Sequence, residues 1–514
     1  MFVKIDSLPI DDSFNLRGCH RYSINFDNKS HFHVTRAHVL SIIRIRKNEF
    51  VWGVHDFMSE FSKGEVSHDE DFNERLLALV DGLAGSGKDV VRISYSDLLG
   101  VDRGRDVLTS YLVRLAGEGA SFCRAIFHTT PRGGVVPIAG GIDAGLPDVL
   151  CKLDLDTVKA LPWEEGVVSV IGDIYNLDGE LSLEAPRSLL RRVISRLKSS
   201  DLTAVVGPEL EFFLFHREGK RITRYGELAG NVYSVGFRGD PEGYLIKMLR
   251  DLDRFEIGVS AGNHEFASGQ FEINLIHSEA LDAADRAFRL KSSVKELALR
   301  EGLEATFMAK PFNDEGGSGF HLHISFVDPT GSNICYDPDD DSGISQTMYR
   351  AIAGILRHAP AISALTNPTI NSYRRFGPDT LAPWLIDWGL DNRSSMIRVP
   401  PERGGATRIE VRLGDASANP YLAIAGVLAG AYLGISGELP LMPALVGYGY
   451  DEERSAKLPP SLSAALDALE DDGELIEVLG KGFVDTFVAY KRDEIARFNS
   501  HVTDWEFDEY STQL

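Results

Sequence analysis

Cysteine is scarce in this sequence, and so are the long apolar runs that mark membrane proteins. The four cysteines, at positions 19, 123, 151 and 335, form no Cys-x-x-Cys pair. A disulfide framework or a structural zinc site is therefore not expected. The longest uncharged apolar run, residues 421–435, is shorter than the roughly 20 residues that a membrane span needs. Since no apolar signal segment is visible near the first methionine either, we predict a cytoplasmic protein.

Positively charged residues are also fewer than negatively charged ones. The 53 Lys and Arg residues stand against 76 Asp and Glu residues, which gives a formal net charge of −23 over 514 residues. A field of this sign repels nucleic acids and anionic membrane surfaces, so small molecules are the expected partners. If the protein binds phosphates, metal ions or clustered arginines must meet them locally.

What the chain does contain is a mixture of helix and strand patterns without an internal repeat, which predicts an α+β protein. Residues 1–35 are polar and aperiodic, and we treat them as an N-terminal extension. Residues 36–182 form a small domain, in which 38–57 has the pattern of a helix followed by a strand. Residues 183–514 form a larger domain, and its apolar run at 421–435 is predicted to be a buried core helix.

A glycine-rich stretch, residues 82–88, matches the GxxxxGK start of a phosphate-binding P-loop. A P-loop needs Ser or Thr at the next position, and Asp89 stands there. It also needs a strand before it and a helix after it, whereas the patterns here predict a helix before and a strand after. We therefore interpret the stretch as a plain glycine turn.

Acidic side chains alternate with apolar ones in two segments of the larger domain. In GPELEFFLF, Glu209 and Glu211 share one face of a predicted strand, and apolar side chains take the other. Carboxylates in so apolar a setting repel each other, and a divalent cation would relieve the repulsion. In NHEFASGQFEINL, Glu265 and Glu272 flank a turn. Solvated acids on an edge strand or in a charged loop are the alternatives, and these patterns alone do not exclude them.

Histidines and arginines follow in two further segments. In GGSGFHLHISF, His321 and His323 share a strand face, which favours a metal ligand and an anion contact over satisfied core histidines. Arginines then gather in an acidic chain, at Arg374, Arg375, Arg393, Arg398, Arg408 and Arg412. Guanidinium groups bind carboxylates and phosphates with paired hydrogen bonds, so we favour an anionic ligand over a surface salt-bridge network. Glutamates and a histidine for Mg²⁺ or Mn²⁺, with arginines for anions, are typical of phosphoryl transfer.

These segments resemble the glutamine synthetase superfamily, in the order of its motifs, over residues 90–510. The resemblance rests on GPELEFFLF, NHEFASGQFEIN, GSGFHLHIS, NSYRRF, DNRSSMIRVP, TRIEVRLGDASANPYL and VTDWEFDEY. It implies a β-grasp domain at 36–182 and a catalytic domain of antiparallel strands flanked by helices at 183–514. It also implies a dodecamer of two stacked hexameric rings, with active sites shared between neighbouring subunits.

The resemblance further implies a role for each motif residue, with ATP as co-substrate and two or three ions of Mg²⁺ or Mn²⁺. The ligands of the ion near glutamate would be Glu211, Glu265 and Glu272, and those of the ion on the ATP phosphates Glu209, His321 and Glu410. The nucleotide contacts would be His323, Ser325, Arg398 and Arg408. The groups that hold glutamate and the transferring phosphate would be Gly317, Arg375, Arg393 and Arg412. Asp97 matches the acid that a neighbouring subunit supplies to the ammonium site.

The family reaction joins glutamate to an amine through γ-glutamyl phosphate, and two departures from the family pattern bear on the amine. Ammonia-using members have a glutamate in PGYEAP, whereas this chain reads GPDTLAP and has Leu381 at that position. Gly316 stands where an asparagine is expected before GSG, which affects how glutamate is bound. We predict an amine pocket formed by Leu381, Asp97 and Trp384, while Trp384 and Trp388 could each lie in the core instead.

The predicted enzyme is therefore a ligase of glutamate and an organic primary amine, either an aromatic one such as aniline or a small alkylamine. A γ-glutamylpolyamine synthetase, a γ-glutamylethanolamide synthetase and a true ammonia-using glutamine synthetase are the alternatives. A non-catalytic structural relative is a further class. Such a relative is expected to have lost metal ligands, and all six are present in this sequence.

Overall fold

The computed structural model describes residues 25–26, 32–33, 70–226, 230, 232–377, 380, 382–450 and 455–514. The chain separates into two units, Met1–His68 and Asp69–Leu514. In the first unit the described residues form two short antiparallel strands, β1 (Asn25–Phe26) and β2 (Phe32–His33). The helix and strand expected within 38–57 lie outside the described residues.

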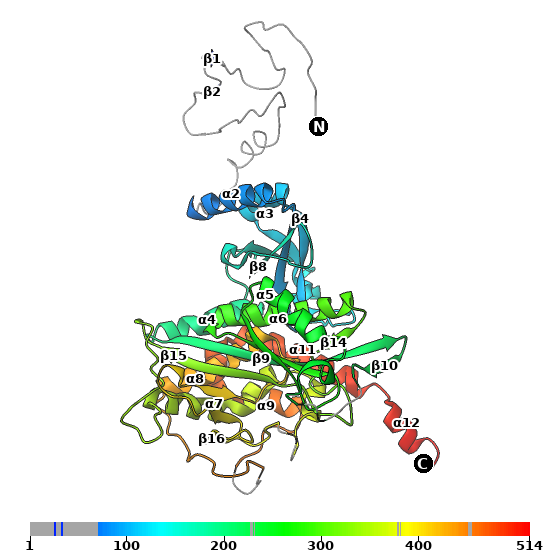
Figure 1. Ribbon diagram of the computed structural model, residues 1–514, viewed down its shortest axis with the longest axis vertical. Helices are drawn as coiled ribbons and strands as arrows, with labels where there is room; N and C mark the ends of the chain where they lie inside the picture. Colours follow the sequence, from blue (N-terminus) through cyan, green and yellow to red (C-terminus); the bar gives the residue numbers. More distant parts are fainter. Residues whose placement is uncertain are drawn as a thin grey trace. The chain divides into compact units, whose positions relative to one another are not determined.

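The second unit begins with a six-stranded sheet that carries two helices (Figure 1). Its elements are α2 (Glu70–Gly85), β3 (Val90–Ser96), β4 (Asp102–Leu108), α3 (Thr109–Glu118), β5 (Ala120–Cys123), β6 (Asp148–Leu153), β7 (Lys159–Ala160) and β8 (Val167–Tyr175). The strand order is β4-β3-β8-β6-β5, β7 pairs with β8, and only the β3–β8 pair among these is parallel. Leu76 of α2 and Leu112 of α3 share a core with Val91 and Val170 of the sheet.

The glycine-rich stretch at 82–88 joins α2 to β3 in this part of the unit. A helix precedes it and a strand follows it. Gly87 has a φ of 72°, a left-handed conformation that glycine adopts without strain. The interpretation as a glycine turn, rather than a P-loop, is confirmed.

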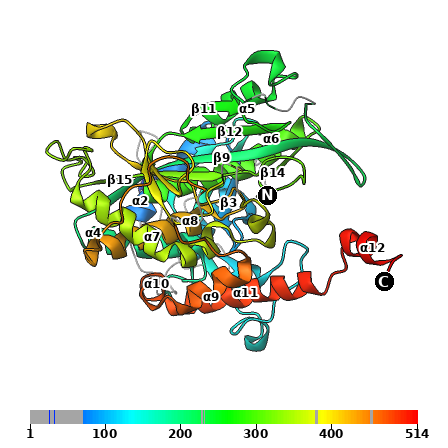
Figure 2. The same cartoon turned by 90° about the horizontal axis from the view of Figure 1, so that it is seen from below.

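The rest of the second unit holds a ten-stranded sheet. Its strands are β9 (Thr203–Glu218), β10 (Arg221–Arg224), β11 (Val259–His264), β12 (Gln270–Leu275), β13 (Ser278–Glu279), β14 (Glu304–Thr306), β15 (Phe320–Val327), β16 (Trp388–Leu390), β17 (Ile397–Val399) and β18 (Ile409–Val411). The order is β11-β12-β9-β15-β18-β17-β16, and β10, β13 and β14 also pair with β9. Figure 2 shows β11, β12 and β9 side by side. The strands are antiparallel except for the β16–β17 pair, so the predicted mixture of helices and largely antiparallel strands is confirmed.

Helices pack against this sheet and against one another. They are α4 (Pro186–Lys198), α5 (Tyr244–Arg254), α6 (Ala280–Arg300), α7 (Gln346–Thr366), α8 (Pro420–Ser436), α9 (Leu462–Asp471), α10 (Gly473–Leu479) and α11 (Lys481–Asn499). The last helix, α12 (Asp504–Tyr510), has no buried residue and projects away from them (Figure 2). Helix α8 is buried over most of its length, as predicted for the apolar run. It lies so close to α7 that a Cβ at Gly354 would come within 2.1 Å of the Gly430 carbonyl oxygen. Among the described helices, none combines the length and the apolar character that crossing a bilayer requires.

Candidate active site

The register of the larger sheet brings the predicted ligand residues onto neighbouring strands. Strand β9 lies between β12 and β15. Glu272 of β12 is paired with Glu211 of β9, and His321 of β15 is paired with Glu209. Glu410 of β18 is paired with His323, the next residue of β15 on the same face. Side chains from four strands therefore converge on one region of the sheet.

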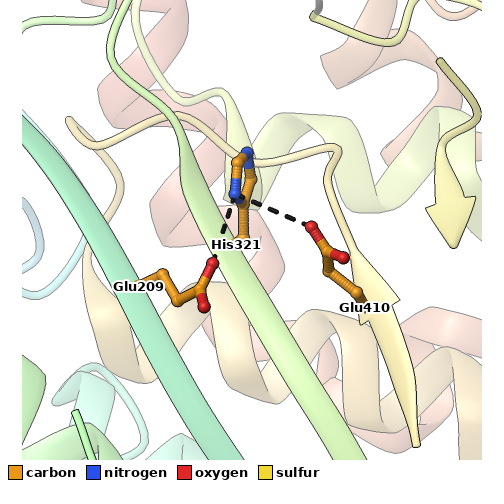
Figure 3. Close-up of side chains that lie close together, drawn as sticks. All are labelled: Glu209, His321 and Glu410. Atoms are coloured by element: carbon orange, nitrogen blue, oxygen red, sulfur yellow. Dashed lines mark ion pairs between the residues drawn. The ribbon is translucent and has the colours of Figure 1, made fainter. Parts of the chain in front are cut away.

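The set predicted to hold the ion on the ATP phosphates is assembled in this region (Figure 3). The Nδ1 atom of His321 lies 3.6 Å from Oε2 of Glu209 and 3.9 Å from Oε1 of Glu410. One possible ligand atom from each of the three residues falls within 4.8 Å of the others. The close-up shows the three side chains pointing toward one another. This geometry suits a single divalent ion.

The set predicted for the ion near glutamate is only partly assembled. Glu211 and Glu272 form a second group of possible ligands, and the third member of this group is again His321. Glu265 follows β11 and belongs to neither group, and the Nδ2 atom of Asn263 donates a hydrogen bond to its carboxylate at 2.9 Å. The imidazole of His321 therefore stands between two groups of carboxylates, whereas the sequence assigned it to one.

Burial and repulsion raise the pKa values of two of these carboxyls. The pKa of Glu272 rises to about 9, first because the carboxyl is buried and then because Glu209 and Glu211 lie nearby. Burial, followed by the charge of Glu211, raises the pKa of Glu265 to about 7. A divalent cation would reverse both effects, and carboxylate oxygens with one imidazole are donors that suit Mg²⁺ or Mn²⁺. The residues therefore fit such ions.

Two other carboxyls of the cluster have lowered pKa values. Burial raises the pKa of Glu410, but the charge of Arg412 and the adjacent histidines outweigh burial and bring it to about 2. Burial acts in the same direction on Glu209, and hydrogen bonds from His321 and His323 bring its pKa well below the usual range. Each of these carboxylates is thus ionised and ready to accept a cation.

Three arginines contact Glu410, of the group formed by Glu209, His321 and Glu410, or the adjacent His323. Both carboxylate oxygens of Glu410 accept hydrogen bonds at 2.6 Å, one from Arg398 and the other from Arg412. The Nε atom of Arg408 donates to Nδ1 of His323 at 3.1 Å, and Nε2 of His323 lies 3.1 Å from Glu209. Because Nδ1 accepts this hydrogen bond, Nε2 is the ring nitrogen that faces the carboxylate.

Arg375 and the glycine turn lie on the other side of the cluster. Arg375 follows the short helix η6 (Ile370–Arg374) and is 5% exposed. A Cβ at Gly317 would lie 2.8 Å from Cγ of Arg375, and one at Gly319 would lie 3.1 Å from its Nη2 and 2.9 Å from Oε1 of Glu211. The predicted glutamate-binding residues Gly317 and Arg375 are therefore neighbours, next to the carboxylate of Glu211, a predicted metal ligand.

Two residues at this site were missed by the sequence reasoning. Gln270 donates from Nε2 to Glu211 at 2.9 Å and to the Gly317 carbonyl at 3.1 Å. It precedes Glu272 by two residues on the same strand face, a signal that could have found it. Tyr233 is joined to the end of β11 by its backbone N–H, which donates to the His264 carbonyl at 2.9 Å, and its side chain is 66% exposed. No motif singles out Tyr233, although its φ of 59° is uncommon for a residue other than glycine.

The remaining predicted residues lie around this centre or apart from it. Arg393 lines a cavity of about 530 Å³ together with residues 390–392 and 444–447. Ser325 lies two residues beyond His323 on β15, on the same face. Arg374 points elsewhere, with its guanidinium 6.0 Å from the ring of Phe498.

The three residues predicted for the amine pocket are not assembled by the described structure. Leu381 lies outside the described residues. Asp97 is 1% exposed, and its carboxylate accepts hydrogen bonds from Arg103 and from the backbone of Leu99 and Val101, all at 2.9 Å. These contacts close the turn between β3 and β4, and a role of Asp97 at a neighbouring subunit's site stays a prediction.

The predicted tryptophans have different surroundings. The ring of Trp384 lies 5.1 Å from the Lys457 ammonium, and its indole N–H is buried without a hydrogen-bond partner among the described residues. Trp388 is 5% exposed within the hydrophobic core, and its indole N–H donates to the Met442 carbonyl at 2.8 Å. Of the two readings left open for Trp388, the structure supports the core.

Comparison with known proteins places this geometry in a family. Residues 183–510 match the glutamine synthetase catalytic domain. A glutamine synthetase of Methanocaldococcus jannaschii is 37% identical over 434 residues, which cover 82% of this chain and 94% of that protein. A glutamate–isopropylamine ligase of a Pseudomonas species is 31% identical over 456 residues, which cover 86% and 99%. The structure of apo GmaS without ligand is similar with a TM-score of 0.76 at 32% identity, covering 84% and 99%. The chain belongs to the glutamine synthetase family of ligases.

Proposed function

We propose that this protein is a ligase that uses ATP to join the γ-carboxylate of L-glutamate to an organic primary amine. The products are a γ-glutamyl amide, ADP and phosphate, and γ-glutamyl phosphate is the intermediate. The observation that carries the proposal is the convergence of metal-ligand side chains from four strands beside Arg375, in a chain of this family. A structural relative without activity would have no need to keep so costly a cluster of buried carboxyls together.

The proposed roles follow the two groups of ligands. Glu209, His321 and Glu410 would hold the ion on the ATP phosphates, and Glu211, Glu265 and Glu272 the ion near glutamate. Bound Mg²⁺ or Mn²⁺ would neutralise the charge of the transferring phosphoryl group.

The chain's own cations complete the proposed site. Arg398 and Arg412 fix the orientation of the Glu410 carboxylate, and Arg408 fixes the orientation of the His323 ring. Arg375, Arg393 and Gly317 are assigned to glutamate and the acyl phosphate, and Ser325 with His323 to the nucleotide. We further propose that 36–182 is a β-grasp domain, and that rings of subunits bring Asp97 to a neighbouring site.

An apolar alkylamine or arylamine is the proposed amine substrate. Leu381 stands where ammonia-using relatives have a glutamate, so the site lacks a carboxylate that would favour a small cation. An apolar pocket disfavours ammonium and polyamines, and it gains about 25 cal/mol for each Å² of hydrocarbon that it buries. The similarity to a glutamate–isopropylamine ligase supports this choice. The similarity to GmaS in its ADP complex supports ATP as the co-substrate.

Ammonia is the second candidate for the amine, because several similar proteins are glutamine synthetases. The enzymes of Methanocaldococcus jannaschii and Halobacterium salinarum are 37% and 32% identical to this chain. These identities are close to the 31% of the isopropylamine ligase and do not separate the two substrates. The choice between the two amines rests on position 381, which is leucine in this chain and glutamate in ammonia-using relatives.

The test is phosphate release from ATP with glutamate, Mg²⁺ and a panel of amines at equal free-base concentration. The panel contains isopropylamine, aniline, ethanolamine, putrescine and ammonium. We expect isopropylamine or aniline to exceed ammonium by at least about tenfold in kcat/KM, since each apolar group buried contributes that much discrimination. A tenfold preference for ammonium or putrescine would refute the apolar amine.

Leu381→Glu sharpens the same test. The introduced carboxylate should shift the preference toward ammonium, while Leu299→Glu, the same change at an exposed leucine of α6, should leave the ranking of amines unchanged. An unchanged ranking in Leu381→Glu would show that this position does not line the amine site.

A further inference from the structure

A cavity of about 410 Å³ lies where the smaller sheet meets the helices of the second unit, apart from the candidate active site. It is lined by the turn between β3 and β4, the loop at 130–132, the end of α7, the start of α8 and one side of α11. Among the described residues, none of those predicted to bind a metal ion, the nucleotide or glutamate lines it. Its volume falls within the range of small-molecule sites, roughly 300–1,000 Å³.

The floor of the cavity is apolar and buried. Leucines of the β3–β4 turn, α7 and α8 form it together with a phenylalanine of α11, and none of them is more than 2% exposed: Leu98, Leu365, Leu422 and Phe487. An apolar concave surface of this size is costly to hydrate, and it gains free energy when hydrocarbon covers it. The floor therefore suits the branched aliphatic part of a small molecule.

A buried ammonium group lies beside this floor. Lys491 of α11 lines the cavity, and its side chain is 1% exposed. The ammonium donates to the Glu494 carboxylate at 2.9 Å and makes no other hydrogen bond among the described residues, although it carries three N–H donors. The aromatic rings of Phe487 and Tyr490 lie 5.9 and 5.5 Å from it. Because a buried cation with unused donors is costly, a further acceptor in the cavity would stabilise it.

The mouth of the cavity is basic. Arg132 and Arg497 line it at exposed positions, and Glu494 is the one acid among the described lining residues. With Lys491, three cations therefore stand against one carboxylate, in a chain whose overall formal charge is −23. This local reversal of charge favours a ligand that carries a negative group.

The cavity also borders two segments that lead to predicted site residues. Asn419 lines it, and its Nδ2 atom donates to the backbone carbonyl of Asp97 at 3.0 Å. Thr369 lines it as well, and its side chain caps η6, the short helix that precedes Arg375. A ligand in the cavity would therefore contact the residues that hold the Asp97 turn and the start of η6.

We propose that this cavity binds a small carboxylate with a branched aliphatic body. The carboxylate accepts hydrogen bonds from the Lys491 ammonium, and the aliphatic body packs against the leucines of the floor. An α-amino acid and an oxo acid share this chemistry, and the ammonium group of an amino acid would have Glu494 as its acceptor. The site goes beyond the proposed function, since it is separate from the metal cluster and needs no ATP.

Isothermal titration of the full-length protein with three acids of one carbon skeleton tests the proposal. The acids are isocaproate, α-ketoisocaproate and L-leucine, and isohexanol is the uncharged control with the same skeleton. We expect the acids to bind and isohexanol to bind at least about tenfold more weakly, because it brings no charge to Lys491. The acid that binds most tightly shows whether the occupant is an amino acid, an oxo acid or a simple acid. Failure of all three acids to bind at millimolar concentration, or equal binding of isohexanol, would overturn the proposal.

Lys491→Met tests the recognition of the carboxylate, because it keeps an unbranched side chain and removes the charge. The Kd of the acids should rise by at least about tenfold. Lys481→Met is the control, the same change at a lysine of α11 whose side chain is 77% exposed and which does not line the cavity, and it should leave the Kd unchanged. Normal binding by a folded Lys491→Met protein would refute the site.

If Lys491→Met fails to fold, Val101→Trp takes its place. Val101 lines the cavity and is 37% exposed, so a larger side chain there should obstruct entry without disturbing the core. Val502→Trp, the same change at an exposed valine outside the lining, should bind the acids normally. Equal binding by the two tryptophan variants would overturn the proposal as well.

Competition separates the cavity from the candidate active site. Saturating L-glutamate and ADP should leave the binding of the three acids unchanged, because the residues assigned to glutamate and the nucleotide do not line the cavity. Displacement of the acids by glutamate would place them in the active site and contradict the inference. Phosphate release with glutamate and an amine tests the proposed function separately, so the two failures are distinguishable.

Discussion

Two buried clusters of charged side chains in this protein differ in how their charges are balanced. In the first, Arg187 of α4 donates to Asp173 of β8 at 2.6 Å, to Asp154 at 2.7 Å and to Asp285 of α6 at 2.8 Å. Arg191 adds a second guanidinium to two of these aspartates, Asp154 and Asp173. Burial raises the pKa of Asp154, but Arg187 outweighs it and lowers the pKa overall.

In the second cluster, carboxyls are left in excess. Glu209, Glu211 and Glu265 all add to the effect of burial on Glu272, whose pKa reaches about 9. In the first cluster every aspartate accepts from the Arg187 guanidinium, which ties the smaller sheet to α4 and α6. The second is incomplete without a cation from outside the chain. Both clusters are buried. The compensation of charge therefore distinguishes a cluster that stabilises the fold from one that binds a ligand.

The largest expected effect is on turnover in the unbalanced cluster. Glu209→Gln and Glu410→Gln should each lower kcat by at least about a thousandfold, because the ATP phosphates lose a ligand of their neutralising ion. Phosphate release measures the loss, and the melting temperature shows whether the variants fold. Near-normal turnover in both variants would show that this group holds no catalytic ion.

The next effect is on stability in the balanced cluster. Arg187→Met should lower the free energy of unfolding by about 3–5 kcal/mol, because three aspartates lose the guanidinium that compensates them. Arg191→Met, at a half-exposed arginine beside two of the same aspartates, should cost less, about 1 kcal/mol or below. Urea denaturation measures both values. Equal losses would mean that burial does not set the strength of this network.

A third prediction concerns pH. In metal-free protein the pKa values of Glu265 and Glu272 are about 7 and about 9, above the ordinary 4.5. The folded chain therefore holds more protons than the unfolded chain, and its stability falls as pH rises from 4.5 toward 9. Each group contributes up to about 1.4 kcal/mol per pH unit. Thermal unfolding of chelator-treated protein across this range measures the fall.

Two comparisons sharpen the pH prediction. Glu272→Gln should flatten the fall in stability, because one titrating group is removed. Saturating Mn²⁺ should also flatten it, because the ion keeps both carboxylates ionised in the folded chain. A stability that stays constant or rises with pH in metal-free wild-type protein would contradict the raised pKa values.

The smallest expected signal comes from mixing subunits. Asp97→Ala and Glu272→Ala proteins, each inactive, should regain up to about a quarter of wild-type activity when reassembled together, since random pairing leaves one interface in four intact. Sedimentation checks that mixed oligomers form. Asp97→Ala protein that loses stability and keeps its activity would make Asp97 a turn residue, as its bonds to Arg103 and the local backbone already suggest.

Much of the site could be predicted from alternation along single strands. Glu209 and Glu211 share a face because they are two residues apart on β9, and the same argument joins His321 to His323 on β15. The helix at 421–435 was predictable because an apolar run flanked by Asn-Pro has few other structures open to it. These inferences depend on local periodicity, which the sequence displays directly.

The alternation of side chains along a single strand does not predict which strands pair with one another. The position of Glu410 opposite His323 follows from the strand order β9-β15-β18, which joins segments far apart in the sequence. Gln270 was missed because its partners, Glu211 and Gly317, lie on other segments of the chain. The amine pocket at Leu381 stays a prediction, since that residue lies outside the described part of the chain.

The most direct test of the proposed reaction follows one oxygen atom. Glutamate labelled with ¹⁸O in its γ-carboxylate is incubated with the protein, ATP, Mg²⁺ and isopropylamine, and the phosphate and the amide are analysed by mass spectrometry. If γ-glutamyl phosphate forms, one labelled oxygen passes to phosphate and the amide keeps the other. Phosphate without label, or phosphate release that does not depend on glutamate, would contradict the assignment of this site to glutamate–amine ligation.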